Sequence, residues 1–325
     1  MSDDDFDFTK PAPSPSGGAP ASVPAPATAP AAPSAPFKPA ISKFYDAVVA
    51  EKFFREAGRA ESLPAGTVIF EEGEKSGKQG LFGKRVIHRM YLFTSGDVAL
   101  TAGGKPLDTV KAGEVFGEMA VISEIPGMTT IAARSATATT KSDCAGYSLD
   151  GTEMQAGLSR TPEFALMLMS VMLDRLRFVA ARLAMRKGAK ATGAVRALSP
   201  FTPEMLQELE DKLKRATVLR LEDGASIMRE GDVGSSMYVV LSGLVEISIR
   251  GAVVETASLG AAFGEMAVVD QSPRAASAVA RGSVKLLAIN RVGLMQLVKS
   301  EPAVGMALMR SMAERLRRMN TMLAQ

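Results

Sequence analysis

Two stretches of this chain are near copies of each other, and this repeat constrains the possible folds more than any other feature. The six residues Phe-Gly-Glu-Met-Ala-Val at 116–121 recur without change at 263–268, 147 positions later. Residues 172–177, Met-Leu-Asp-Arg-Leu-Arg, are matched by Met-Ala-Glu-Arg-Leu-Arg at 312–317, now 140 positions later. The chain is therefore predicted to hold two related modules, and the second is shorter between its copy of the six residues and its last helix.

The repeat and the composition divide the chain into four parts. Residues 1–40 hold ten of the 18 prolines, mixed with Ala, Ser and Gly. Such a segment cannot bury enough apolar surface to offset its ordering entropy, so a disordered tail is predicted. Residues 41–185 form the first module and residues 202–325 the second. A short basic linker at 186–201 joins them.

Hydrophobic patterning predicts the same order of elements in both modules. Short alternating runs punctuated by glycine are typical of strands in a sandwich or barrel. Helical spacing and N-cap residues, Ser42 and Thr202 among them, predict the helices. The expected strands are 67–70, 90–93, 97–101 and 107–110, then 217–221, 226–229, 237–241, 245–249 and 253–256; the expected helices are 42–58 and 162–185, one that starts at 202, and 302–323.

Composition favours an intracellular protein that is not an enzyme. The single cysteine, Cys144, cannot form an intrachain disulfide, which is typical of the cytoplasm. The chain starts without a basic and apolar leader, and no apolar run reaches the roughly 20 residues of a membrane span. The only histidine, His88, lies in a Gly- and Lys-rich stretch and is expected to be a solvated loop residue. Neither a metal cluster nor a catalytic triad is therefore expected.

The segment 263–277 carries the residue types of an anion site. Gly264 lets a backbone approach a ligand, and 265–269 is long enough for one helical turn whose N–H groups favour an anion. Arg274 follows ten residues after Gly264, within reach of the same anion. The Glu265 carboxylate accepts hydrogen bonds and suits a sugar hydroxyl rather than a phosphate. A phosphate-binding arginine beside a hydroxyl acceptor indicates a nucleotide.

This segment resembles the phosphate-binding cassette of the cyclic-nucleotide-binding domain family, Phe-Gly-Glu-(Leu/Met)-Ala, a spacer and then Pro-Arg-Ala-Ala-(Thr/Ser). The resemblance covers about residues 46–185 and 205–325. It implies a mainly β fold with flanking helices: two tandem β-roll, or jelly-roll, domains with C-terminal helices, ordered as in protein kinase A regulatory subunits. We call 263–277 the second cassette and the corresponding segment from residue 116 the first cassette.

The resemblance also implies roles for individual residues. Glu265 would bind the ribose 2′-hydroxyl and Arg274 the cyclic phosphate, while a C-terminal helix would cover the base. Ala275 offers no hydroxyl to a guanine, which favours cyclic AMP; Ser277 could compensate, so cyclic GMP stays the alternative. Ser235 stands where kinase regulatory subunits carry an acid that orients the arginine. The predicted ligand-binding residues are Phe263, Gly264, Glu265, Met266, Ala267, Arg274, Ala275, Ala276 and Ser277, with Leu316, Met319 and Leu323 as a possible base cap.

The first cassette departs from the family pattern. At the spacing of 147 the position of Arg274 falls on Gly127, so its phosphate partner is predicted to be lost and Glu118 to lack a cation. The first module is accordingly predicted to be degenerate. A basic expansion between residues 73 and 90 either supplies a replacement cation, binds a partner, or is a solvated loop.

Both long helices carry an apolar seam. Met169, Met172, Leu176, Val179 and Leu183 recur 140 positions later as Met309, Met312, Leu316, Met319 and Leu323. The seams could pair within one chain as a pseudo-dimer or between two copies as a homodimer. We predict a cyclic-nucleotide sensor that acts through an unidentified protein partner and has no direct DNA contact, since no helix-turn-helix follows the last helix. The alternative is a scaffolding protein with two degenerate β-rolls and no small ligand.

Overall fold

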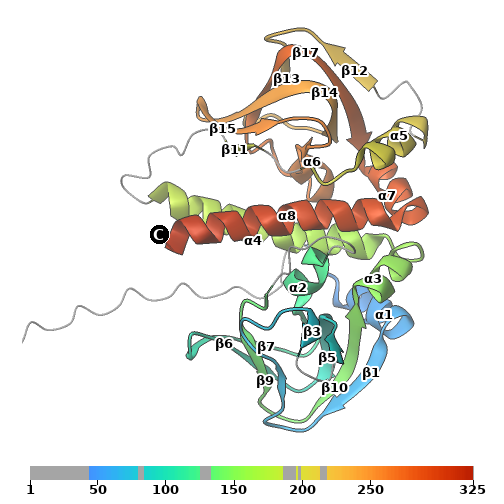
Figure 1. Cartoon of the computed structure of the whole chain (residues 1–325), viewed down its shortest axis with the longest axis vertical. Helices are drawn as coiled ribbons and strands as arrows, with labels where there is room; N and C mark the ends of the chain where they lie inside the picture. Colours follow the sequence, from blue (N-terminus) through green and yellow to red (C-terminus); the bar gives the residue numbers. More distant parts are fainter. Residues whose placement is uncertain are drawn as a thin grey trace, which may run out of the picture. The chain divides into compact units, whose positions relative to one another are not determined.

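The computed structural model describes residues 44–79, 84–124, 133–185, 195–196, 199–212 and 218–324. The predicted tail and most of the predicted linker lie outside these residues, as do Ser42 and Gly127. Figure 1 shows the chain with most of its elements labelled.

The described residues of the first module form two four-stranded antiparallel sheets, a small hairpin and four helices. The sheet orders are β1-β10-β5-β8 and β2-β9-β6-β7, and β3 pairs with β4. Its elements are α1 (Ala47–Ala57), β1 (Arg59–Leu63), β2 (Val68–Phe70), β3 (Gly77–Gln79), β4 (Lys84–Val86), β5 (Arg89–Ser95), β6 (Val98–Ala102), β7 (Lys105–Val110), β8 (Val115–Phe116), α2 (Glu118–Ser123), β9 (Thr137–Thr140), β10 (Cys144–Asp150), α3 (Gly151–Leu158) and α4 (Glu163–Met185).

The second module is built on one seven-stranded sheet with the path β11-β15-β14-β17-β12, in which β13 also pairs β17 and β16 pairs β14. The predicted linker contributes β11, which lies parallel to β15. Its elements are β11 (Val195–Arg196), α5 (Pro203–Lys212), β12 (Val218–Leu221), β13 (Ser226–Met228), β14 (Ser236–Ile249), β15 (Ala252–Ala257), β16 (Ala262–Phe263), α6 (Glu265–Val269), β17 (Ser277–Asn290), α7 (Arg291–Ser300) and α8 (Pro302–Ala324).

The strand patterns of the two modules differ at a glycine that both copies share. Gly96 separates β5 from β6, whereas Gly243, 147 positions later, lies inside β14, where the strand register shifts. Gly243 has a φ of +85°, and a Cβ there would lie 2.4 Å from the carbonyl oxygen of Ser283. Only glycine fits this bend without strain. One long bent strand in the second module thus corresponds to two strands in the first.

Helix boundaries agree with the sequence patterns except at the first cap. Helix α1 begins at Ala47, and its N-cap is Asp46, whose side chain accepts hydrogen bonds from the N–H groups of Val48 and Val49. The predicted cap, Ser42, came four residues too early because Asp46 satisfies the free amides of the first turn. For α5 the Thr202 hydroxyl accepts from the Met205 N–H at 3.3 Å, as predicted.

The histidine predicted to be solvated is buried. His88 is 0% exposed, and its Nδ1 lies 3.0 Å from the Glu124 carboxylate. Burial raises the pKa of Glu124, but hydrogen bonds from His88 and Ser76 outweigh it, so this pKa lies below its ordinary value. Arg89, also in the basic expansion, bonds Ser148, Asp150 and Glu153. These two side chains of the expansion are therefore part of the packed structure.

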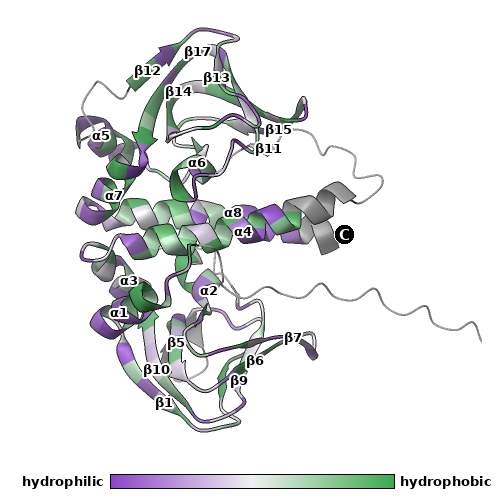
Figure 2. Cartoon of the chain, turned by 180° about the vertical axis from the view of Figure 1, so that it is seen from behind, coloured by the Kyte–Doolittle hydropathy of each residue, from purple (hydrophilic) through white to green (hydrophobic). Residues whose placement is uncertain are grey.

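Helices α4 and α8 pack against each other within the chain. The seam residues Met169 and Met172 of α4 lie in one continuous hydrophobic core with Met309 and Met312 of α8. Figure 2 shows both helices mostly hydrophobic in their N-terminal halves and more hydrophilic further on. This is the intramolecular pairing that the repeated seams predicted as one of two alternatives. No helix among the described residues has the length and apolar character needed to cross a membrane.

Candidate ligand-binding site

The second cassette begins with a tight turn from strand to helix. Phe263 ends β16 and is 2% exposed, with its ring centre 5.4 Å from that of Tyr238. Gly264 caps α6 in the left-handed conformation, with a φ of +75°. Glu265 starts the helix and is 6% exposed. The predicted one-turn helix at 265–269 is therefore present with the predicted bounds.

The cassette closes when Arg274 returns to Gly264. Nη1 of Arg274 donates to the Gly264 carbonyl oxygen at 2.9 Å, and the guanidinium carbon lies 5.5 Å from the centre of the Tyr238 ring. The Arg274 N–H donates to the Asp232 carbonyl at 2.9 Å, and its carbonyl accepts from the Gly231 N–H at 2.8 Å. These backbone bonds fix the residue to the glycine loop before β14.

Arg274 is buried without a matching negative charge. It is 6% exposed, and within the described parts of the chain its guanidinium forms no ion pair with a carboxylate. A buried, unpaired cation costs free energy unless an anion meets it. The Gly264 carbonyl satisfies part of its hydrogen-bonding capacity, and no carboxylate of the described residues compensates its charge. The electrostatics of this site therefore favour a bound anion.

Glu265 faces a cation that was not predicted from the sequence. Its Oε1 accepts from Arg315 Nη1 of α8 at 2.6 Å, and Glu255 of β15 lies 3.6 Å from Arg315 Nη2. Burial lowers the pKa of Arg315, but the nearby Glu265 and Glu255 carboxylates raise it more, so the pKa lies above its ordinary value. The C-terminal helix is thus tied directly to the residue that the resemblance assigns to the ribose.

The remaining predicted residues surround this turn in different environments. Ala275 is exposed and Ala276 is 9% exposed. The Ser277 hydroxyl accepts the Glu230 N–H at 3.0 Å. Met266 is partly buried against the hydrophobic core that contains α4 and α8, and Ala267 is buried. Of the predicted base cap, Leu316 is buried, Met319 is partly buried against the same core, and the Leu323 side chain lies outside the described residues.

The first cassette has not lost its arginine, contrary to the prediction. Nη1 of Arg134 donates to the Gly117 carbonyl at 2.9 Å, and its backbone bonds Glu74 and Gly73 as Arg274 bonds Asp232 and Gly231. Arg134 precedes Arg274 by 140 positions, not 147, because the first cassette holds seven more residues before its arginine. Aligning the two cassettes at the single spacing of 147 therefore placed Gly127, rather than Arg134, opposite Arg274.

The two arginines differ in how far the protein already satisfies them. Nη2 of Arg134 donates to the Arg89 carbonyl at 2.8 Å, its guanidinium carbon lies 4.0 Å from the Phe70 ring centre, and Nε lies 4.0 Å from Glu74. Burial lowers the pKa of Arg134. For Arg274 the corresponding contacts are one carbonyl and a more distant ring. Arg134 is therefore engaged by protein acceptors to a greater extent than Arg274.

Glu118 of the first cassette also has a cation, against expectation. Arg175 of α4 forms an ion pair with Glu118, just as Arg315 of α8 does with Glu265. Sequence reasoning missed both arginines, although the repeat aligns them at the spacing of 140. Their apolar neighbours indicated helix packing, and nothing local showed that these positions face a cassette.

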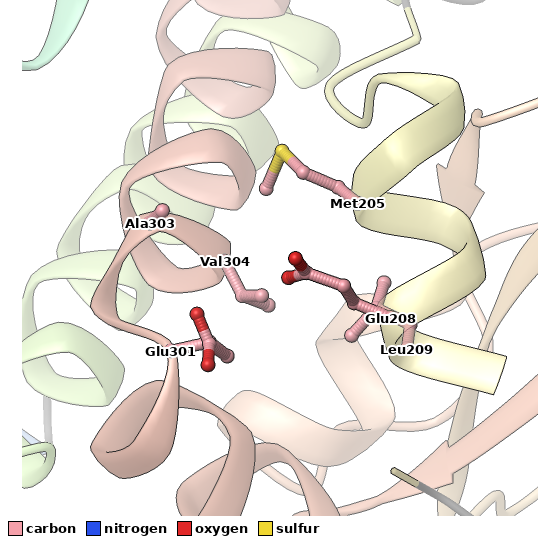
Figure 3. Close-up of a pocket in the computed structure, with 6 residues that line it drawn as sticks. All are labelled: Met205, Glu208, Leu209, Glu301, Ala303 and Val304. Carbon is pink, nitrogen blue, oxygen red and sulfur yellow. The ribbon is translucent and has the colours of Figure 1, made fainter. Parts of the chain in front are cut away.

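A separate hollow lies between α5 and the junction of α7 and α8 (Figure 3). It has about 270 Å³ of unfilled space, part of it open to solvent. Its lining is apolar apart from the carboxylates of Glu208 and Glu301, which repel an anion. The hollow does not include the cassette, so we do not assign the phosphate site to it.

Comparison with known proteins shows what this site is similar to. The family model described as cyclic nucleotide-binding domain matches residues 218–301. The cAMP-dependent protein kinase regulatory subunit of Yarrowia lipolytica is 26% identical over 230 residues, 70% of this chain and 52% of that protein. The CRP-like cAMP-activated global transcriptional regulator of Mycobacterium tuberculosis is 30% identical over 106 residues, 31% of this chain and 47% of that protein.

Among solved structures, the catabolite activator protein of Thermus thermophilus is 30% identical, covering 38% of this chain and 59% of that chain, with a TM-score of 0.33. The chain spans about half the length of the curated relatives named here. Residues 218–301, which carry Glu265 and Arg274, match the model of the cyclic nucleotide-binding domain family. The resemblance and the β-roll fold class predicted from the sequence are confirmed.

Proposed function

We propose that this chain is an intracellular cyclic-nucleotide sensor without catalytic activity, and that its second module binds cyclic AMP. The observation that carries the proposal is Arg274, buried against Gly264 without a carboxylate partner among the described residues. A cyclic phosphate there would supply the missing negative charge. A charge-assisted hydrogen bond of this kind contributes roughly 1.5–3 kcal/mol.

In this proposal, Glu265 couples ligand binding to a movement of α8. A ribose hydroxyl donating to the Glu265 carboxylate would compete with the guanidinium of Arg315, which occupies one carboxylate oxygen at 2.6 Å. Ligand would thereby shift α8 between arrangements, and the Met319 region of that helix would close over the base. Such a shift changes the surface that α8 offers to a protein partner.

The first module serves, in this proposal, as the structural half. Arg134 already donates to two backbone carbonyls and lies over an aromatic ring, so a phosphate would have to displace protein acceptors. The predicted degeneracy therefore rests on the engagement of this arginine rather than on its loss.

Isothermal titration of the full chain with cyclic AMP and with cyclic GMP tests the proposal. Arg274→Ala should weaken binding of the preferred nucleotide roughly 10- to 100-fold, the value of one charge-assisted contact. Arg220→Ala, which removes an exposed charge from β12, is the matched control and should bind like the wild type. If neither nucleotide binds below about millimolar, the sensor proposal is wrong and the scaffolding alternative stands.

A further inference from the structure

A side chain of the first module reaches into the second cassette. Arg177 of α4 forms an ion pair with Asp270 through Nη2, and the same nitrogen donates to the Ser272 hydroxyl at 3.0 Å. Its Nη1 donates to Asp174 of α4 at 2.7 Å. The guanidinium is therefore held from its own helix while it contacts two residues of the other module.

The contacted residues form the turn that leads to Arg274. Asp270 is the C-cap of α6, and its Oδ1 accepts the Ser272 N–H at 3.1 Å. Gln271 between them has a φ of +56°, a conformation that costs roughly 1–2 kcal/mol for a residue other than glycine. The Asp270 side chain is only 2% exposed. A strained turn that persists needs contacts that fix it, and Arg177 touches both of its ends.

The contact has a counterpart that makes a natural control. Arg317 of α8 lies 140 positions after Arg177 and crosses in the opposite direction, donating to the Met119 carbonyl at 3.2 Å and to the Ser123 hydroxyl. Ser123 occupies, 147 positions earlier, the place of Asp270. The repeat thus sets equivalent arginines on opposite cassettes. At the corresponding place the second cassette presents the buried Asp270 carboxylate to Arg177, and the first presents the Ser123 hydroxyl to Arg317.

We propose that Arg177 is a positioning residue for the ligand site of the second module, supplied by the first. By holding Asp270 and Ser272 it fixes the turn two residues before Arg274, and so presents Arg274 to the cyclic phosphate. The first module then has a defined role in ligand binding without binding ligand itself. The inference rests on the proposed function, because it concerns the affinity of that same site.

The test is titration of full-length variants with cyclic AMP, alongside thermal unfolding. Arg177→Met should weaken binding about tenfold, within the usual range of couplings between sites. Arg177→Lys, which keeps the charge, should recover much of that loss. Asp270→Asn should also weaken binding, and the double variant should be no weaker than Arg177→Met alone, since the two residues act through one contact.

Arg317→Met is the matched control: it removes the equivalent interface arginine and should leave cyclic AMP affinity within about twofold of the wild type. Equal losses in the two methionine variants would indicate a general packing effect and overturn the inference. So would wild-type affinity in Arg177→Met and Asp270→Asn. Failure of the wild type itself to bind would instead refute the proposed function, and with it this inference.

Discussion

At the scale of single residues, the site is defined by which charges have partners. Glu265 is balanced by Arg315, and Glu118 by Arg175, whereas Arg274 contacts a carbonyl and a ring and pairs with no carboxylate of the described segments. Burial increases the energetic effect of these differences. A charge that water cannot reach costs free energy unless an opposite charge in the protein or in a ligand compensates it. The unbalanced charge is the one that the family resemblance assigns to the phosphate.

The Glu265–Arg315 pair leads to a prediction about stability. Arg315→Met should lower the free energy of unfolding by about 2 kcal/mol, less than for a fully buried pair because the Arg315 side chain is 27% exposed. The cost arises because the Glu265 carboxylate loses its cation while it stays buried. Chemical denaturation of Arg315→Met and of the double variant with Glu265→Gln measures it. The double variant should be the more stable of the two; equal stability would contradict this account.

At the scale of elements, the cassette depends on a short strand, a left-handed glycine and a one-turn helix in immediate succession. Two separate features of the geometry favour glycine at position 264. Its φ of +75° strains any other residue, and a Cβ at this position would lie 2.7 Å from Nη1 of Arg274. The close approach thus concerns Arg274, the proposed phosphate-binding residue, whereas the strain is general.

Gly264→Ala should therefore weaken cyclic AMP binding about tenfold or more, equivalent to losing one charge-assisted contact. Gly251→Ala is its control, since Gly251 has a φ of +79° and a Cβ there would meet no other atom within 4 Å. Both variants should lose roughly 1–2 kcal/mol of stability from strain, but only Gly264→Ala should lose affinity. Titration with cyclic AMP and chemical denaturation of both variants test this prediction. A similar loss of affinity in Gly251→Ala would argue against the geometric explanation.

At the scale of the whole molecule, α4 and α8 join the modules through one hydrophobic core. Residues of both modules share it, from Phe53 and Met90 in the first to Met237 and Leu287 in the second. Each helix also contacts the cassette helix of the opposite module, α4 with α6 and α8 with α2. The modules are therefore expected to depend on each other for stability.

Urea unfolding should accordingly show one transition, with the same midpoint for Tyr147→Trp in the first module and Tyr238→Trp in the second. Met172→Ala and Met312→Ala should each lower the free energy of that transition by about 3 kcal/mol, because each empties a site in the shared core. The midpoint should not change with protein concentration if the two helices pair within one chain. Two separate transitions would refute the shared core, and a concentration-dependent midpoint would favour the homodimer.

The sequence by itself determined the two-module architecture, most strand and helix positions, and the cassette with Gly264, Glu265 and Arg274. These features are local, because periodicity, capping and a contiguous motif depend on residues that are close together in the sequence. The predictions that failed concerned residues brought together from a distance. His88 is buried in contact with Glu124, 36 positions later, and Arg134 was missed because seven extra residues precede it in the first cassette.

Only the tertiary structure decided which charges meet. Arg315 reaches Glu265 across 50 positions, and Arg177 reaches Asp270 from the other module. No local pattern distinguishes an arginine on an exposed helical face from one that points into a cassette, since both have the same helical spacing. That distinction depends on how the two long helices pack. Their apolar seams are compatible with pairing within one chain and with pairing between two chains. In this structure the two helices pair within one chain. This pairing places Arg177 of the first module beside the second cassette and Arg317 of the second module beside the first.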